Sequence, residues 1–323
     1  MGTRIKEKAI LKKNKLVSKG LQIIVVLLGI TFISYFLMYL SPGDPVKSLF
    51  YASGIEPTEA QLEQTRVSLG LDKPFHVQYF RWLFHCLRGD LGMSISTGEP
   101  VAQLLLSRLI PTLNLTLLSM VFMLIMALPM GIASAVYANK PIDNIIRIFN
   151  FFTISMPNFW VGMLLLYFIA LQWGLLPVIA VRGGFEAMIL PALTLGIAMA
   201  GKYSRQVRSI VLEQLFSDYV IGARARGIPP YKIMLSYVLP NSMLPLVTLL
   251  GLSIGSLLGG TAVVEVIFSY SALGSLAMDG ITSMDYPLVQ GYVLFCALVY
   301  MLINLLVDYI YYLIDPHVRK GEA

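Results

Sequence analysis

The sequence predicts an all-α membrane protein with six transmembrane helices, and three observations support this prediction. The 323-residue chain is 57% hydrophobic and only 13% charged, whereas about 25% of the residues in a soluble domain are charged. Uncharged runs recur along the chain, several of them as long as the roughly 20 residues that a membrane-spanning helix needs. Lysine and arginine concentrate in alternate segments between these runs, as expected for a chain that crosses a bilayer repeatedly.

The predicted spans follow the uncharged windows at residues 20–42, 109–139, 148–181, 187–201, 233–264 and 286–307. The fourth window is the weakest, because only 15 residues separate Glu186 from Lys202. A run of this length is also compatible with a buried or re-entrant segment. The Lys202 side chain can extend toward the lipid headgroups, which would lengthen the span.

The distribution of basic residues predicts the orientation of the chain. If all six windows cross the membrane, 17 of the 24 lysines and arginines fall on the side that holds both termini. Basic residues next to membrane spans stay in the cytoplasm, so we expect both termini to be cytoplasmic. The net charge of +6 is thus an orientation signal and not the footprint of a nucleic-acid partner.

The expected organisation starts with a basic cytoplasmic N-terminus at 1–20 and a first transmembrane helix at 21–41. A cleaved signal peptide is the alternative, but the apolar run is longer than the usual 7–15 residues and lacks a clear cleavage pattern. An extracytoplasmic loop follows at 42–108. A transmembrane core of five helices at 109–315 includes a cytoplasmic loop at 212–240, and a cytoplasmic tail occupies 316–323.

The extracytoplasmic loop is expected to contain two short helices. Thr58 can cap the first as part of a capping box with Gln61, and Gly70 provides a stop. The second carries Val77, Phe80, Phe84 and Leu87 at helical spacing. We expect these apolar side chains to pack against the membrane surface.

No catalytic residue, resident metal or cofactor is predicted for this chain. Gly196, Gly201 and Lys202 match part of a phosphate-binding loop, but Tyr203 replaces the required Ser or Thr and the match lies within a span. The three histidines and two cysteines are not spaced as metal ligands. No acid or base is expected at mid-span, with Glu265 and Asp308 at span ends, which argues against a proton- or sodium-driven carrier.

Small and uncharged polar residues in the spans are candidates for helix packing or for lining a pathway. Gly251, Gly255 and Gly259 recur every four residues, a pattern that lets another helix approach closely, within this chain or in another. The polar candidates are Asn114, Asn158, Ser253 and Asn304.

The cytoplasmic loop contains the most informative segment. Asp218 begins an expected short helix that ends at Gly227, before two prolines. Ala223 and Gly227 would give this helix a face of low bulk for close approach by a partner, and Arg224 and Arg226 would border it. A solvated helix attracted to anionic lipid is the alternative interpretation.

The spacing of Ala223, Gly227 and Leu239-Pro240 resembles the "EAA" loop of ABC importer permeases, although Ile221 stands where the family has glutamate. The likeness runs nearly end to end and is to the oligopeptide/dipeptide/nickel permeases, specifically the first of their two paired subunits. The blocks that carry it include "SPGDP", "GDLGMS", "SMPNFW", "ILPALTLG", "DYVIGARARG" and "MDYPLVQG".

This resemblance implies a type I ABC importer permease in the cell membrane, coupled to ATPases through Asp218, Ala223, Arg224, Arg226, Gly227 and Pro240. The implied partners are a homologous second permease, two cytoplasmic ATPases that bind ATP and magnesium, and an extracytoplasmic solute-binding protein. The cargo is a di- or oligopeptide or a nickel chelate. A channel or secondary transporter that needs no ATP is the second hypothesis, and a membrane-embedded enzyme is the third.

Overall fold

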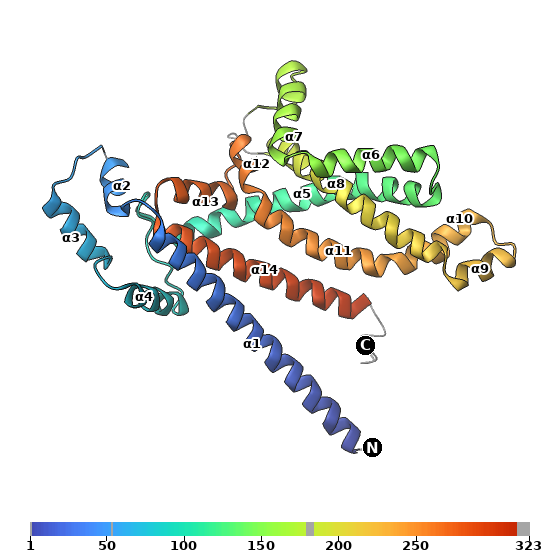
Figure 1. Ribbon diagram of the computed structural model, residues 1–323, viewed down its shortest axis with the longest axis horizontal. Coiled ribbons are helices and arrows are strands. Elements are labelled where there is room, and N and C mark those ends of the chain that lie inside the picture. Colours follow the sequence, from blue (N-terminus) through green and yellow to red (C-terminus); the bar gives the residue numbers. More distant parts are fainter. Residues whose placement is uncertain (1, 53, 179–183, 315–323) are drawn as a thin grey trace. The chain divides into compact units, whose positions relative to one another are not determined.

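The computed structural model describes residues 2–52, 54–178 and 184–314. Within these ranges the regular secondary structure is helical, apart from one isolated antiparallel bridge between Met93 and Pro100. It forms two compact units, residues 1–107 with 276–301 and residues 108–275 with 302–323. Figure 1 shows the helices in chain order. Helices α5 (Val101–Val136), α13 (Leu273–Thr282) and α14 (Tyr286–Ile314) contribute residues to both units.

The described residues contain five helices long and apolar enough to cross a membrane. They are Gly20–Leu40 within α1 (Gly2–Leu40), Val101–Val136, Phe185–Leu215, Pro230–Leu257 and Tyr286–Val307. A sixth span is obtained if the bent pair Pro141–Ser155 and Asn158–Gln172 is counted as one. The prediction of an all-α membrane protein is therefore confirmed, with a difference at the third window.

The third predicted span, 148–181, is wrong as a single straight helix. Helix α6 (Pro141–Ser155) begins earlier, and the axis bends by 103° before α7 (Asn158–Leu165) and a π-helical turn at Leu166–Gln172. Met156 is extended at φ −82° and ψ 134°, because the ring of Pro157 disfavours a helical residue before it. The end of the predicted window, 179–181, lies outside the described residues.

The fourth window belongs to a full-length helix. Helix α8 (Phe185–Leu215) has 31 residues and continues through Lys202, Arg205 and Arg208. The apparent phosphate-binding glycines are packing positions on this helix. A Cβ atom at Gly196 would lie 2.8 Å from Cβ of Phe122 on α5, and one at Gly201 would collide with Thr153 on α6.

In the first unit, two short helices precede α4, and both follow local sequence rules. Helix α2 (Pro45–Ala52) starts after Asp44, which pairs with Arg66 of α3 (Glu59–Leu69). The predicted capping box is present: Thr58 N donates to Gln61 Oε1 at 2.9 Å and Gln61 N donates to Thr58 Oγ1 at 3.4 Å. Gly70 ends α3 with φ +71°, as predicted.

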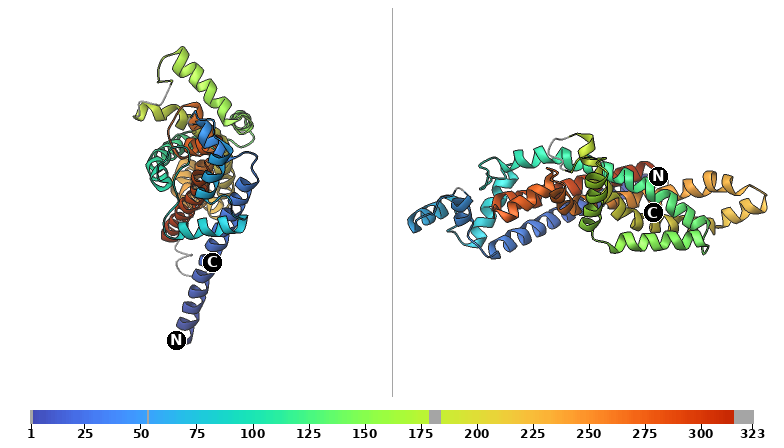
Figure 2. Two further views of the ribbon diagram at one scale, coloured as in Figure 1. Left: turned by 90° about the vertical axis from the view of Figure 1, so that its left-hand side faces the viewer. Right: turned by 90° about the horizontal axis from the view of Figure 1, so that it is seen from above.

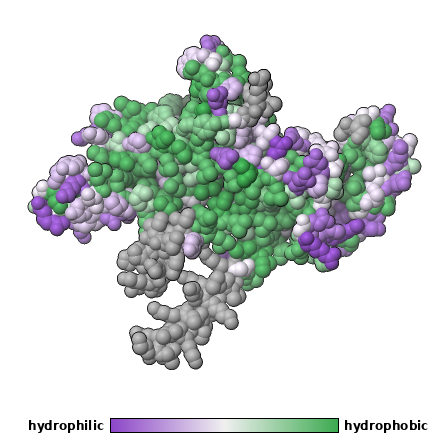
Figure 3. Space-filling view, turned by 180° about the vertical axis from the view of Figure 1, so that it is seen from behind, coloured by the Kyte–Doolittle hydropathy of each residue, from purple (hydrophilic) through white to green (hydrophobic). Residues whose placement is uncertain are grey.

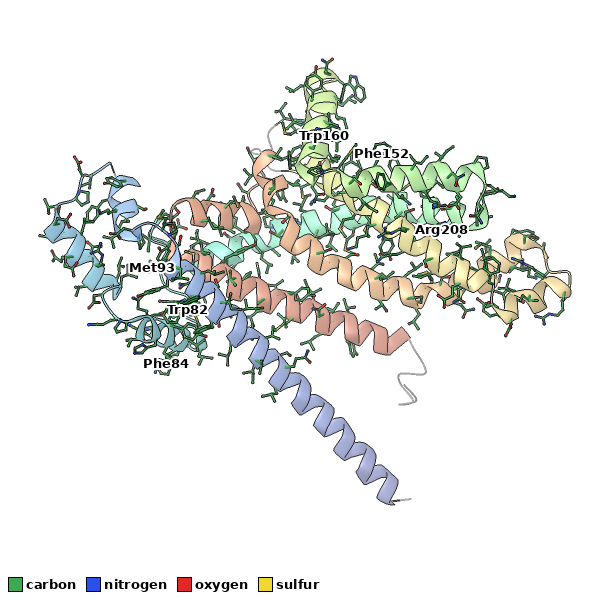
Figure 4. All side chains as sticks on the ribbon, viewed as in Figure 1. Trp82, Phe84, Met93, Phe152, Trp160 and Arg208 are labelled. Atoms are coloured by element: carbon green, nitrogen blue, oxygen red, sulfur yellow. The ribbon has the colours of Figure 1, made fainter. Side chains whose placement is uncertain are left out.

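Helix α4 (Phe75–Leu87) packs beside α1 through one aromatic face, as Figures 1 and 2 show. Phe75, Tyr79 and Trp82 make edge-to-face or tilted ring contacts with Phe32 and Tyr35 of α1. The hydroxyl groups of Tyr79 and Thr31 are hydrogen bonded at 3.1 Å. The predicted apolar stripe of Val77, Phe80, Phe84 and Leu87 lies on the exposed side of α4, and Figure 4 shows Trp82 and Phe84 on this helix.

The second unit has two apolar cores formed by its long helices. One joins α5 and α8 to α9 (Asp218–Ala225), α10 (Pro230–Ile233), a π-helical turn at Met234–Val238 and α11 (Leu239–Gly260). The other lies around Leu115, Leu195 and Phe268 and includes α12 (Ala262–Ile267). The Tyr203 hydroxyl donates to the Leu246 carbonyl at 2.8 Å and so joins α8 to α11.

Candidate functional site

The predicted cytoplasmic helix is present as α9, which covers Asp218–Ala225. It follows α8 after a two-residue corner, where Ser217 Oγ donates to the Gln214 carbonyl at 2.6 Å. The hydroxyl of Tyr219 donates to Gln214 Oε1 at 2.6 Å and braces the same corner. These bonds fix the direction in which α9 leaves α8. Both α9 and α10 lie where the ends of α8 and α11 meet, as Figures 1 and 2 show.

One side of α9 is buried in the chain's own core. Val220 and Ala223 have no exposed surface and pack with Val211, Ile233 and Val238. The prediction that Ala223 belongs to a docking face is therefore wrong. Alanine is needed there because α9 lies close over the ends of its neighbouring helices.

The opposite side of α9 is exposed. We call the residues Asp218, Ile221, Gly222, Arg224 and Arg226 the outward face of α9, and all five are exposed. Ile221, the large apolar side chain of this face, is 56% exposed. In Figure 3 hydrophilic side chains gather at this end of the second unit, at the left of the view.

Gly227 ends the α9 turn through its backbone conformation. Its φ is +74°, a value that favours glycine, and a Cβ atom there would meet nothing within 4 Å. The backbone N–H groups of Gly227 and Ile228 donate to the carbonyls of Arg224 and Ala223. Glycine is thus required for the turn itself, and the space next to it is open.

The return to the membrane runs through Pro229, α10 and the π-helical turn. Pro240 lies in the first turn of α11, where its missing N–H costs no helical hydrogen bond, and it is exposed. The side chain of Asn241 donates to the Tyr237 carbonyl at 2.8 Å. The predicted Leu-Pro element therefore marks the change from the π-helical turn to α11.

The structure does not bring the polar pathway candidates together. Asn114 on α5 and Asn158 at the start of α7 are exposed, and Asn304 on α14 is half-buried. Ser253 is 8% exposed, and its hydroxyl donates to the Leu249 carbonyl of its own helix at 2.8 Å. These four residues therefore stay individual candidates.

The glycine stripe on α11 is used within the subunit at one position. A Cβ atom at Gly251 would collide with the side chain of Val307 on α14. Gly255 is half-buried, whereas the surroundings of Gly259 lie outside the described residues. At Gly251, therefore, the closely approaching helix belongs to this chain and not to another subunit.

One acid is buried in the first turn of α6, between the second and third predicted spans. Asp143 on α6 has no exposed surface and receives two hydrogen bonds, each of 2.8 Å, from Nε and Nη2 of Arg208 on α8. The Ser134 hydroxyl and the Asn139 N–H also donate to it. Figure 4 shows Arg208 on α8 below α6. The pair joins the ends of α5, α6 and α8.

Two more carboxylates are buried where the sequence suggested helix ends. Glu265 on α12 has no exposed surface, and its Oε2 accepts a 2.7 Å hydrogen bond from the Ser275 N–H. Burial raises the pKa of this carboxyl. Asp285 precedes α14 and is also fully buried. Among the described residues, no three His, Cys, Asp or Glu side chains gather as a metal centre would require.

Most of the chain matches models of known protein families. Residues 127–320 match the family model "Binding-protein-dependent transport system inner membrane component", and residues 13–116 match the N-terminal model of such membrane components.

Curated relatives are similar over nearly the whole chain. The probable D,D-dipeptide transport system permease protein DdpB of Escherichia coli K12 is 36% identical over 328 residues, covering 93% of this chain and 95% of the relative. The glutathione transport system permease protein GsiC of Salmonella paratyphi A is 38% identical over 306 residues, covering 95% and 99%. A solved structure of the MetNI methionine ABC transporter matches in fold, with a TM-score of 0.55, 19% identity and coverage of 66% of this chain and 97% of that chain.

Proposed function

The chain belongs to the family of inner-membrane components of binding-protein-dependent transport systems, and we propose that it forms half of a pathway that imports short peptides. It is an ABC importer permease with the type I fold, as the resemblance of the sequence implied. An ATP-independent carrier or channel is accordingly set aside. The observation that supports peptide as the cargo is the 36–38% identity, over at least 93% of the chain, to DdpB and GsiC.

The cargo proposal favours peptides over nickel. The names of both relatives refer to peptides, a D,D-dipeptide and glutathione. Among the described residues no cluster of metal ligands would favour a bare cation either. A nickel chelate is therefore the second candidate. It is kept because the wider family that the sequence resembles includes nickel permeases.

We further propose that the ATPase contacts the outward face of α9. Isoleucine at 221 offers an apolar anchor, and Arg224 and Arg226 offer guanidinium groups at its border. Two ATPases, a second permease and an extracytoplasmic binding protein complete the proposed complex, with ATP and magnesium held by the ATPases. Closure of the ATPase pair would displace α9 together with the ends of α8 and α11, because they share one core.

Uptake by the reconstituted complex tests the cargo. Proteoliposomes holding both permeases and the ATPases, with binding protein outside and ATP inside, are expected to accumulate labelled dipeptide or glutathione. Accumulation of labelled nickel without peptide uptake would overturn the proposal. Omission of ATP is the matched control for leakage.

Cross-linking tests the docking face separately. In a background lacking Cys86 and Cys296, Ile221→Cys is expected to cross-link to the ATPase. Leu117→Cys, which is 59% exposed on α5, is expected not to do so. Equal yields at the two positions, or none at either, would contradict contact through α9.

A further inference from the structure

A cavity between α6 and α8 is not explained by the coupling helix or by packing. Its volume is about 620 Å³. It is lined by Arg147, Asn150, Phe151, Ile154 and Ser155 of α6 and by Arg205 and Arg208 of α8. Three guanidinium groups thus converge on one cavity in a chain with only 13% charged residues. We call it the arginine cavity.

The charge of the arginine cavity is only partly neutralised. Arg208 is paired with Asp143 through both Nε and Nη2. Arg147 and Arg205 are exposed, and neither has an ion-pair partner among the residues that the structure describes. Two positive charges therefore remain at the cavity. An anion placed there would accept charge-assisted hydrogen bonds from both sides.

Asn150, one of the residues that line the cavity, carries a buried polar atom. Asn150 is 4% exposed, and its Nδ2 donates to Ser204 Oγ at 3.1 Å. Its Oδ1 is buried and has no hydrogen-bond partner among the residues that the structure describes. An unpartnered buried acceptor is costly, so it favours a ligand that brings a donor such as a hydroxyl. The cavity thus offers cationic donors together with one buried acceptor.

The walls next to these polar groups are apolar. Phe151 is 69% exposed and Ile154 is 43% exposed. Arg147 and Ile154 are seven residues apart on α6, which is about 10 Å along a helix. An anionic headgroup held at Arg147 would therefore be followed by a surface suited to acyl chains. A small hydrophilic anion would leave that surface uncovered.

We propose that the arginine cavity binds an anionic phospholipid with a hydroxyl-bearing headgroup, of which phosphatidylglycerol is the simplest example. Arg147 and Arg205 would hold the phosphate, Asn150 would accept from a headgroup hydroxyl, and Phe151 and Ile154 would contact an acyl chain. The charge distribution of the chain places these arginines toward the cytoplasm, where anionic lipids attract basic residues. Basic cavities between transmembrane helices on this side are suited to such headgroups.

The test measures lipid binding to the purified, delipidated permease complex by native mass spectrometry. Phosphatidylglycerol, phosphatidylcholine and free glycerol phosphate are compared, and Arg147→Gln/Arg205→Gln is the test variant. Lys202→Gln/Lys232→Gln removes the same charge at exposed residues that do not line the cavity and is the matched control. We expect phosphatidylglycerol to bind at least tenfold more weakly to the test variant and within twofold of wild type to the control.

Other outcomes would overturn the proposal. Equal binding of phosphatidylglycerol and phosphatidylcholine would show that the headgroup need not be anionic. Undiminished binding of phosphatidylglycerol to the test variant would show that Arg147 and Arg205 do not hold it. Binding of glycerol phosphate as tight as that of the lipid would identify a free phosphate ester as the ligand. Cross-linking of Phe151→Cys to the second permease would identify the cavity as an interface between subunits. Peptide uptake, measured separately, distinguishes these outcomes from failure of the transport proposal.

Discussion

The Asp285 carboxylate accepts a 2.5 Å hydrogen bond from the hydroxyl of Ser94, a residue 191 positions away in the chain. The same oxygen accepts from the N–H and hydroxyl of Ser96, and the other oxygen accepts from the Leu288 N–H in the first turn of α14. Asp285 thus caps α14 with one oxygen and holds the turn at residues 94–97 with the other. It joins the loop at residues 88–100 to the start of the last span within the first unit.

Asp285→Asn is expected to loosen this turn while keeping the helix cap. Asparagine retains one oxygen for the Leu288 N–H, but its NH₂ group cannot accept from Ser94 and Ser96. Loss of a buried charged acceptor costs about 1.5–3 kcal/mol. Hydrogen exchange should therefore become faster at residues 94–97. Asp279→Asn, at an exposed site on α13, is the control, and unchanged exchange in Asp285→Asn would contradict the assigned role.

Arg208→Met is expected to destabilise the second unit by leaving the Asp143 carboxylate buried and unpaired. Breaking a buried pair on one side costs about 3 kcal/mol or more, whereas removing both charges costs much less. The double variant Asp143→Asn/Arg208→Met should therefore recover most of the loss in Tm. Lys202→Met, an exposed residue on α8, serves as control. A double variant as unstable as the single one would show that the charge pairing is not what matters.

Gly227 offers a test that separates conformation from steric contact. A side chain at φ +74° is strained by about 1–2 kcal/mol, but asparagine adopts this region far more readily than a β-branched residue. Gly227→Asn should keep peptide uptake coupled to ATP hydrolysis, and Gly227→Val should lower uptake per ATP hydrolysed. The two side chains have similar bulk. Equal loss in both would indicate close contact with a partner at this position instead.

Cys86 on α4 is expected to react slowly with maleimides. Burial, with a smaller contribution from the charge of Asp90, raises the pKa of its thiol to about 12. Since the thiolate is the reactive form, the labelling rate at pH 8 should be at least about a hundredfold below that of an ordinary exposed thiol. Leu87→Cys, at a side chain 79% exposed, provides the comparison in a background with Cys86 and Cys296 replaced by serine. Comparable rates would show that α4 leaves α1 in solution.

Local patterns predicted local structure well. The capping box at Thr58, the stop at Gly70 and the extent of α9 each depend on a few neighbouring residues, so the sequence alone was sufficient. Long apolar windows predicted most of the spans for the same reason. The bend at Pro157 was missed because a long apolar window indicates that a segment can lie in lipid, but it does not indicate whether the helix axis changes direction.

Pairings between distant residues could not be predicted. Asp143 and Arg208 lie 65 residues apart, and each was assigned to a polar segment because charge was used to delimit the spans. The burial of Ala223 depends on α8, α10 and α11 meeting beneath it, which no spacing within α9 reveals. Of the two small residues that suggested a docking face, Ala223 packs inside the chain and Gly227 serves the turn after α9.

The burial of Val220 and Ala223 in the same core as Val207 and Leu246 also bears on inhibitor design. A synthetic peptide covering residues 218–230 would lack the helices α8 and α11, on which the buried side of α9 packs. A helix of eight residues is also not stable alone in water. Such a peptide should compete poorly for the ATPase. A mimic would have to carry the ends of α8 and α11 as well, since the outward face exists only as the surface of that joint core.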